Sequence, residues 1–162
     1  MSNYVTRAQK FVRDLYPFIL SYDEDGLFRA AYAFNSAKHR RVHVMSGAAR
    51  VAFITSDYVV KIDYTDGRAE GCGGCLNEIK FYRFACREGY DYLLAAIDAY
   101  EYMGVTFYIM PKIAGVGCHE FGYGLTEDEI DWLMEFVDDL HQYNFGVRAG
   151  KLCVIDYAWS YA

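Results

Sequence analysis

The chain has 162 residues, of which 54% are hydrophobic, 18% aromatic and 23% charged, and its net charge is −6. This length fits one domain, or one domain with a small appendage. Charged residues interrupt every apolar run before the ~20 residues that a membrane span needs, and they also interrupt the first twenty residues, where a signal peptide would be apolar. The acidic balance argues against general binding to nucleic acid. We therefore expect a soluble, cytoplasmic protein with no membrane contact.

Two helices are predicted before the first strand. Apolar residues recur at three and four positions over residues 6–20, with Thr6 as a candidate cap. A second helix is predicted over residues 23–37, where three acidic residues suit a helix N-terminus and Phe28, Ala31, Tyr32 and Ala33 continue the apolar pattern. The basic run at residues 38–41 is better explained as a solvated turn before a strand than as a binding patch.

An antiparallel meander is predicted next, because the hydrophobic period changes from helical to alternating. Its strands are expected at residues 42–44, 50–55 and 58–64, and then, beyond a helix at residues 77–87, at residues 95–102 and 105–110. Residues 95–102 could equally extend a helix, because their alanines are ambiguous. Two-residue turns are expected at Ser56-Asp57 and Met103-Gly104.

A last helix is predicted from Thr126, which forms a capping box with Glu129, to Leu140. A short hairpin with its turn at Ala149-Gly150 should follow.

A glycine-rich loop at residues 66–75 carries Cys72 and Cys75 at a spacing that suits zinc or redox chemistry. A zinc site needs two more ligands, and the nearest candidate pair, Cys118 and His119, is adjacent in sequence, which is a poor ligand spacing. The five cysteines are also an odd number in a chain without a secretion signal. We therefore expect two incidental thiols in a flexible loop.

Acidic residues gather where the sequence would not place them for stability alone. Glu135, Asp138 and Asp139 crowd the C-terminal end of the last predicted helix, where the macrodipole favours cations. Such an inconsistency marks either a functional position or a solvated acidic end. Asp156 directly follows an apolar strand, so it either caps the next turn or belongs to a site. Together with Asn144, these side chains supply the hard oxygen groups that Mg²⁺ and phosphate transfer require.

The motif Asp139-Leu140-His141-x-x-Asn144, followed by Val154-Ile155-Asp156-Tyr157, resembles the catalytic and metal-binding loops of the protein-kinase-like superfamily. The resemblance is greatest to the aminoglycoside and choline kinase branch and to small kinases encoded by bacteriophages. Upstream segments resemble further parts of that family in the same order, over about residues 42–159. They are the lysine strand Val59-Val60-Lys61-Ile62, the helix glutamate in Asn77-Glu78-Ile79, and the adenine hinge in Ile109-Met110-Pro111-Lys112.

The resemblance implies a role for each of these residues. Lys61 would hold the ATP phosphates and Glu78 would orient it through an ion pair. Asp139 would position the substrate hydroxyl or accept its proton, and Asn144 and Asp156 would bind Mg²⁺. The loop at Ser46 and Gly47 would cover the phosphates, Met110 would lie at the adenine, and His141 would support the catalytic loop.

The chain also departs from the family. The loop Ser46-Gly47-Ala48-Ala49 has one of the usual glycines, and Val137 stands where a histidine commonly precedes the catalytic aspartate. Tyr157-Ala158 replaces the Phe-Gly pair after the metal aspartate. The sequence stops at Ala162, before the helices in which kinases hold peptide substrates, so we expect a truncated C-terminal lobe.

The expected fold is thus α+β and kinase-like. It comprises a helical extension (residues 1–40), a lobe with a five-stranded antiparallel sheet and one helix (41–112), and a truncated lobe (113–162). One predicted function is a minimal phosphotransferase that uses ATP and Mg²⁺, is encoded by a phage, and acts on a hydroxyl of a host protein or a small molecule. The alternative is a catalytically inactive binding module that inhibits a host enzyme or defence protein. The complete set of polar residues favours the first, and the absent substrate lobe favours the second.

Overall fold

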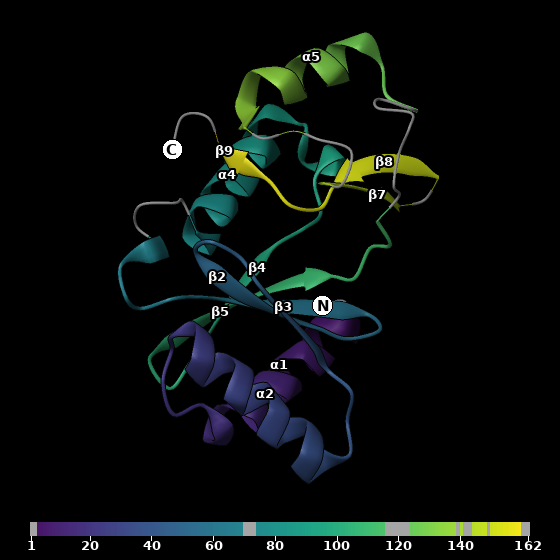
Figure 1. Ribbon diagram of the computed structural model, residues 1–162. Coiled ribbons are helices and arrows are strands. Elements are labelled where there is room, and N and C mark those ends of the chain that lie inside the picture. Colours follow the sequence, from purple (N-terminus) through teal and green to yellow (C-terminus); the bar gives the residue numbers. More distant parts are fainter. Residues whose placement is uncertain are drawn as a thin grey trace. The chain divides into compact units, whose positions relative to one another are not determined.

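A computed structural model describes residues 3–69, 74–115, 124–138, 140, 144–148 and 150–159 (Figure 1). The chain forms two compact units, one containing residues 1–75 and 97–112 and the other containing residues 76–96 and 113–162. The helices of the first unit are α1 (Asn3–Leu15), the short 3-10 helix η1 (Tyr16–Phe18) and α2 (Glu24–Lys38). Its strands are β1 (His43–Ser46), β2 (Arg50–Ile54), β3 (Tyr58–Asp63), β4 (Asp98–Tyr102) and β5 (Val105–Pro111).

The strands of the first unit make one antiparallel sheet in the order β1-β2-β3-β5-β4. The two predicted turns are confirmed. The amide of Thr55 donates to the carbonyl of Tyr58 over 3.0 Å around Ser56-Asp57, and β4 and β5 are joined at Met103 and Gly104, which both have positive φ. The predicted α+β class, with two leading helices and a five-stranded antiparallel sheet, is therefore confirmed.

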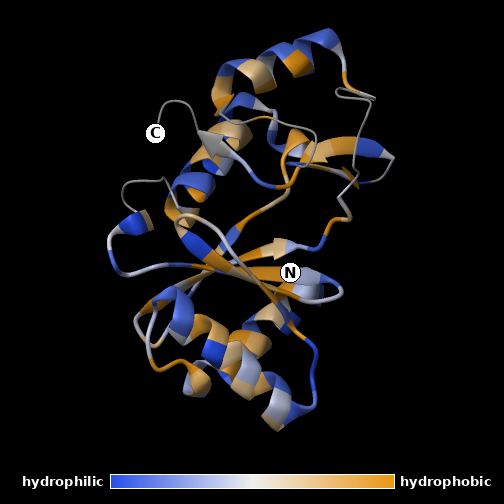
Figure 2. Cartoon of the chain, in the orientation of Figure 1, coloured by the Kyte–Doolittle hydropathy of each residue, from blue (hydrophilic) through white to orange (hydrophobic). Residues whose placement is uncertain are grey.

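The core of the first unit lies between its two long helices and one face of the sheet, as Figure 1 shows. Side chains alternate between the faces of a strand, so Val51 and Phe53 of β2 and Val60 and Ile62 of β3 point to the helices. These strands are correspondingly hydrophobic in Figure 2, whereas α1 and α2 combine polar and apolar residues. The helices contribute the buried residues Ala8, Phe11, Val12, Leu15, Leu27, Ala30, Ala31 and Phe34.

Two details of the leading helices were predicted wrongly. Helix α1 begins at Asn3, before Thr6, and ends at Leu15, where η1 with Pro17 replaces the expected last turn. In α2, Phe28 and Tyr32 are 38% and 81% exposed, because the stripe buried against the core runs through Leu27, Ala30, Ala31 and Phe34. The helix carries apolar residues on adjacent stripes, so its own periodicity does not select between them.

The second unit contains α4 (Cys75–Glu88), which starts at the unit boundary, and the 3-10 helix η2 (Asp91–Leu93). It continues with α5 (Glu127–Phe136) and the strands β6 (Val137–Asp138), β7 (Phe145–Arg148), β8 (Lys151–Val154) and β9 (Ala158–Trp159). Strands β7 and β8 make the predicted hairpin, and β6 pairs with β9. The indole ring of Trp132 stacks on Tyr90 and Phe81, with centroids 4.8 and 5.7 Å apart, and the Tyr157 hydroxyl donates to the carbonyl of Ala95 over 3.0 Å.

Helix α5 confirms its predicted start and corrects its predicted end. The Glu129 amide donates to the Thr126 hydroxyl over 3.2 Å, and the Thr126 amide donates to the Glu129 carboxylate over 2.9 Å. The helix ends at Phe136 instead of Leu140, since Val137 and Asp138 leave it to pair with β9. The macrodipole argument therefore does not apply to Asp138.

Two further observations complete the fold. Residues 95–97 do not join β4, which begins at Asp98; the Ala95 amide bonds instead to the carbonyl of Val154 over 2.8 Å. Of the helices in the described part of the chain, none combines the length and apolar character needed to cross a membrane.

Candidate functional site

Lys61 occupies the middle strand of the sheet and is only 7% exposed. It lies opposite Ala52 of β2 and Tyr108 of β5, on the face of the sheet that α1 and α2 do not cover. Met110 pairs with Val59, two residues before Lys61, so Met110 shares that face and is also buried. The structure thus places the expected phosphate lysine and the expected adenine-hinge residue on one face of one sheet.

The connection that was expected to cover phosphates joins β1 to β2. Ser46 is the last residue of β1, and the Gly47 amide donates to the carbonyl of Arg50 over 2.8 Å. This bond closes a tight, exposed turn at the end of the β1–β2 hairpin. A Cβ on Gly47 would meet nothing closer than 3.7 Å, so the glycine is not required by packing there.

Three of the expected site residues belong to the second unit. Glu78 lies in the first turn of α4 and is 1% exposed. Asn144 directly precedes β7, and its carbonyl accepts a hydrogen bond of 2.7 Å from the amide of Ile155. Asp156 follows two residues after β8 and is exposed. The two expected Mg²⁺ ligands therefore lie together at the open end of the β7–β8 hairpin.

Other expected residues fall outside the part of the chain that the structure describes. These are Asp139, His141, Cys72, Cys118 and His119. Within the described ranges, no group of three or more histidine, cysteine, aspartate or glutamate residues is arranged to hold a metal ion. Asn144 and Asp156 are only two ligands, fewer than such a group requires. Their amide and carboxylate oxygens are nevertheless of the type that Mg²⁺ accepts, alongside water and phosphate.

A second polar feature, which sequence reasoning missed, is a groove of about 530 Å³ in the first unit. It lies along α1 and the turn between β2 and β3. Its charged lining residues are Arg7, Lys10, Asp14, Arg40 and Asp57, and the remaining ones are Phe11, Phe34, Thr55, Ser56 and Tyr58. Arg40 belongs to the basic run at residues 38–41, for which a solvated turn was the preferred prediction. Basic residues on the outer face of a helix are usual, so the sequence held no signal that α1 would contribute to a groove.

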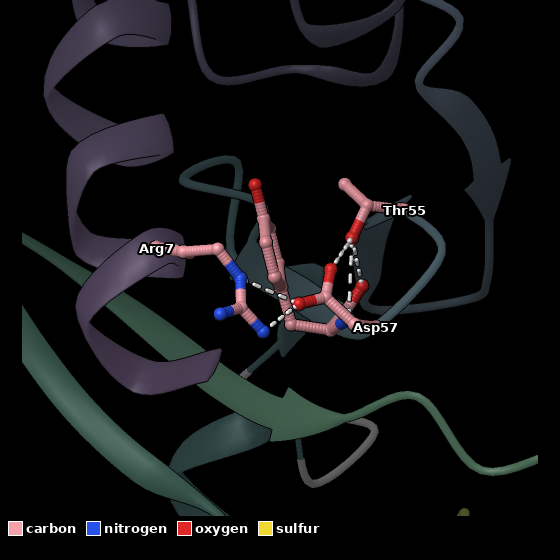
Figure 3. Close-up of polar contacts among 4 residues, drawn as sticks. Arg7, Thr55 and Asp57 are labelled. Carbon is pink, nitrogen blue, oxygen red and sulfur yellow. Dashed lines mark hydrogen bonds and ion pairs between the residues drawn. The ribbon is translucent and has the colours of Figure 1, made fainter. Parts of the chain in front are cut away.

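An ion pair crosses this groove from helix to turn (Figure 3). The Arg7 guanidinium donates from Nε to Oδ2 of Asp57 over 2.7 Å, and its Nη2 contacts the same oxygen. The turn is fixed from inside by Thr55, whose hydroxyl donates to the carbonyl of Tyr58 over 2.9 Å. Burial of the Tyr58 hydroxyl raises its pKa, although the nearby Arg40 charge opposes this shift. The phenol is therefore neutral throughout the physiological range.

Comparison of the chain with family models, with curated proteins and with solved structures finds no match.

Proposed function

We propose that the chain is a minimal kinase-like phosphotransferase that uses ATP and Mg²⁺. The observation that carries this proposal is Lys61, a lysine held almost fully buried on the middle strand of an antiparallel sheet. Lysine is rarely buried to this extent unless its ammonium has a polar or charged partner. In protein kinases, a lysine on the third strand of the sheet binds the phosphate oxygens of ATP.

The order of elements along the chain supports the same proposal. The lysine strand β3 is followed by α4, whose first turn carries the buried Glu78, and then by the strand pair β4 and β5. After the capped helix α5 comes the β7–β8 hairpin, with Asn144 and Asp156 at its open end. Protein kinases present a strand lysine, a helix glutamate, a catalytic-loop asparagine and a metal-binding aspartate in this order.

Each residue then has one task. Lys61 binds phosphate oxygens and Glu78 keeps the ammonium oriented. Asn144 and Asp156 supply oxygen ligands to Mg²⁺, and Asp139 positions the acceptor hydroxyl. ATP supplies the transferred phosphoryl group, and we propose a protein hydroxyl as its acceptor. Catalysis of this kind relies mainly on positioning and charge, so a small number of fixed polar residues is sufficient.

Calorimetric titration of ATP, with and without Mg²⁺, tests the proposal. The native chain should bind ATP more tightly with Mg²⁺, and Asp156→Ala should remove that metal dependence. Asp131→Ala is the matched control, because Asp131 is an exposed aspartate on α5 that has no part in the proposed site. If the native chain binds no nucleotide, phosphotransfer is ruled out and the chain is better described as a binding module. If binding follows the expectation, transfer of labelled γ-phosphate to proteins of a cell lysate is the next measurement.

A further inference from the structure

Positive charge is concentrated on the helices of the first unit, although the chain as a whole is acidic. Residues 3–43 contain seven lysines and arginines against four aspartates and glutamates, in a chain of net charge −6. Three of the seven, Arg7, Lys10 and Arg40, line the groove along α1. A local field of this sign raises the encounter rate with an acidic partner and disfavours a basic one.

The two acidic residues of the groove are already partnered. Asp57 accepts the ion pair from Arg7, and Asp14 lies 2.6 Å from the Lys10 ammonium, one helical turn away. Arg40 makes no ion pair with any residue that the structure describes, and its side chain is exposed. The groove therefore keeps one guanidinium available, and a guanidinium binds carboxylates through two parallel hydrogen bonds.

The backbone on both sides of Arg40 is tied to α2. His39 ends the helix in the left-handed conformation, with φ of 51°, and the Arg40 amide donates to the carbonyl of Asn35 over 3.0 Å. The side chain of Asn35 then donates to the carbonyl of Val42 and accepts from its amide, each over 2.9 Å. Because the backbone of this segment is already ordered, binding at Arg40 costs the protein less conformational entropy than binding at a free loop.

We propose that this groove binds an acidic peptide segment of a partner protein, through Arg40 and the outer edge of the Arg7 guanidinium. Phe11, Phe34 and Tyr58 also line the groove, but each is only 3% exposed and packs in the core of the first unit, so the charged side chains make the contacts proposed here. A nucleic acid backbone is a poorer occupant, because the chain as a whole carries a net charge of −6, which opposes a long polyanion more than a short peptide segment. The volume of about 530 Å³ lies within the range of ligand sites and suits a short segment. This site is independent of nucleotide and goes beyond the proposed phosphotransfer.

Fluorescence anisotropy with a labelled hexapeptide of alternating glutamate and serine tests the site, using the full chain in the absence of nucleotide at low salt. Native protein should bind this peptide, and it should not bind the counterpart in which lysine replaces glutamate. Arg40→Ala should weaken binding about five-fold, the effect of one exposed ion pair, and Arg40→Glu should weaken it more than ten-fold. Added salt should also weaken it. Arg83→Glu, the same reversal at an exposed residue of α4, should leave affinity unchanged.

Three results would overturn the inference. They are the absence of saturable binding, equal binding of the lysine peptide, and an affinity that Arg40→Glu does not alter. Free glutamate or benzoate that competes as well as the peptide would also overturn it, since the groove would then be a site for small anions. Circular dichroism confirms that each variant is folded, and Arg40→Gln, which removes the charge and keeps a polar, unbranched side chain, replaces any variant that is not.

Discussion

Replacing Glu129 with glutamine should destabilise the second unit at neutral pH and abolish a dependence of its stability on pH in acid. Glu129 is 4% exposed and its carboxylate is surrounded by donors. The Thr126 amide and the Lys151 ammonium each donate over 2.9 Å, and the Tyr92 hydroxyl donates as well. The variant keeps an acceptor oxygen for the neutral donors but removes the charge that faces Lys151.

The pKa of Glu129 fixes the size of the effect. Burial by itself raises this pKa, but the hydrogen bonds and the charge of Lys151 outweigh burial and lower it from 4.5 to about 2. A carboxylate with a depressed pKa stabilises the fold fully above its unfolded pKa, and this stabilisation is lost as the pH falls towards 2. The difference between these two pKa values corresponds to at most about 3 kcal/mol of stability. Since the Lys151 side chain is 42% exposed, solvent screening reduces our expectation to about 2 kcal/mol.

Urea unfolding followed by tryptophan fluorescence measures this effect, because Trp132 is packed in the same helix. At pH 7 the free energy of unfolding of the native chain should exceed that of Glu129→Gln by about 2 kcal/mol. This difference in free energy should shrink steadily as the pH falls below 4.5. Glu127→Gln is the control, an exposed glutamate in the same helical turn, with an expected change of a few tenths of a kcal/mol. A difference between native and Glu129→Gln that stays constant from pH 7 to pH 2.5 would refute the role of charge.

Three further substitutions test local features of the fold. Met103→Asn should stabilise the fold by about 0.5–1 kcal/mol and so raise its melting temperature. The reason is that Met103 is exposed, with φ of 52°, in a two-residue hairpin turn that favours Asn-Gly. An unchanged or lower melting temperature would contradict this. Gly146→Ala should cost about 1–3 kcal/mol in urea unfolding, since its Cβ would lie 2.5 Å from the side chain of Ile113 and 2.9 Å from a backbone oxygen; native-like stability would show that the strand shifts freely. Asn35→Ala should cost about 1–3 kcal/mol through its two lost hydrogen bonds, and faster amide exchange at Val42 should accompany it, whereas unaltered exchange would exclude the tether.

Features that depend on residues close in sequence could be predicted. The capping box at Thr126 and the turns at Ser56-Asp57 and Met103-Gly104 each involve side chains or dihedral angles within a few positions. The strands that these signals separate also alternate clearly enough to be recognised. For that reason the two leading helices, the five-stranded sheet and the C-terminal hairpin are all present in the expected order, although the bounds of α1 and β4 differ.

Features that depend on distant partners could not be predicted. The helical pattern of α5 continues through Leu140, but Val137 pairs instead with Trp159, a contact that no local pattern signals. The groove likewise needs Arg7 and Asp57, which are 50 residues apart. For the kinase-like site, the sequence suggested residue types and order, and the structure adds the burial of Lys61 and the shared position of Asn144 and Asp156. Their roles in phosphate transfer stay predictions.

The division of the first unit over two separate parts of the chain bears on how the protein is made. Its core needs Phe107 and Ile109 of β5 as well as the helices at the N-terminus, and α4 is translated between them. At roughly 5–20 residues per second, α1 and α2 leave the ribosome several seconds before the strand that completes their core. During that interval Phe11 and Phe34 can pack on each other, on other residues of the leading helices and on the first three strands, but not on β5. The nascent helix pair is therefore open to aggregation, and to chaperones, during that part of synthesis.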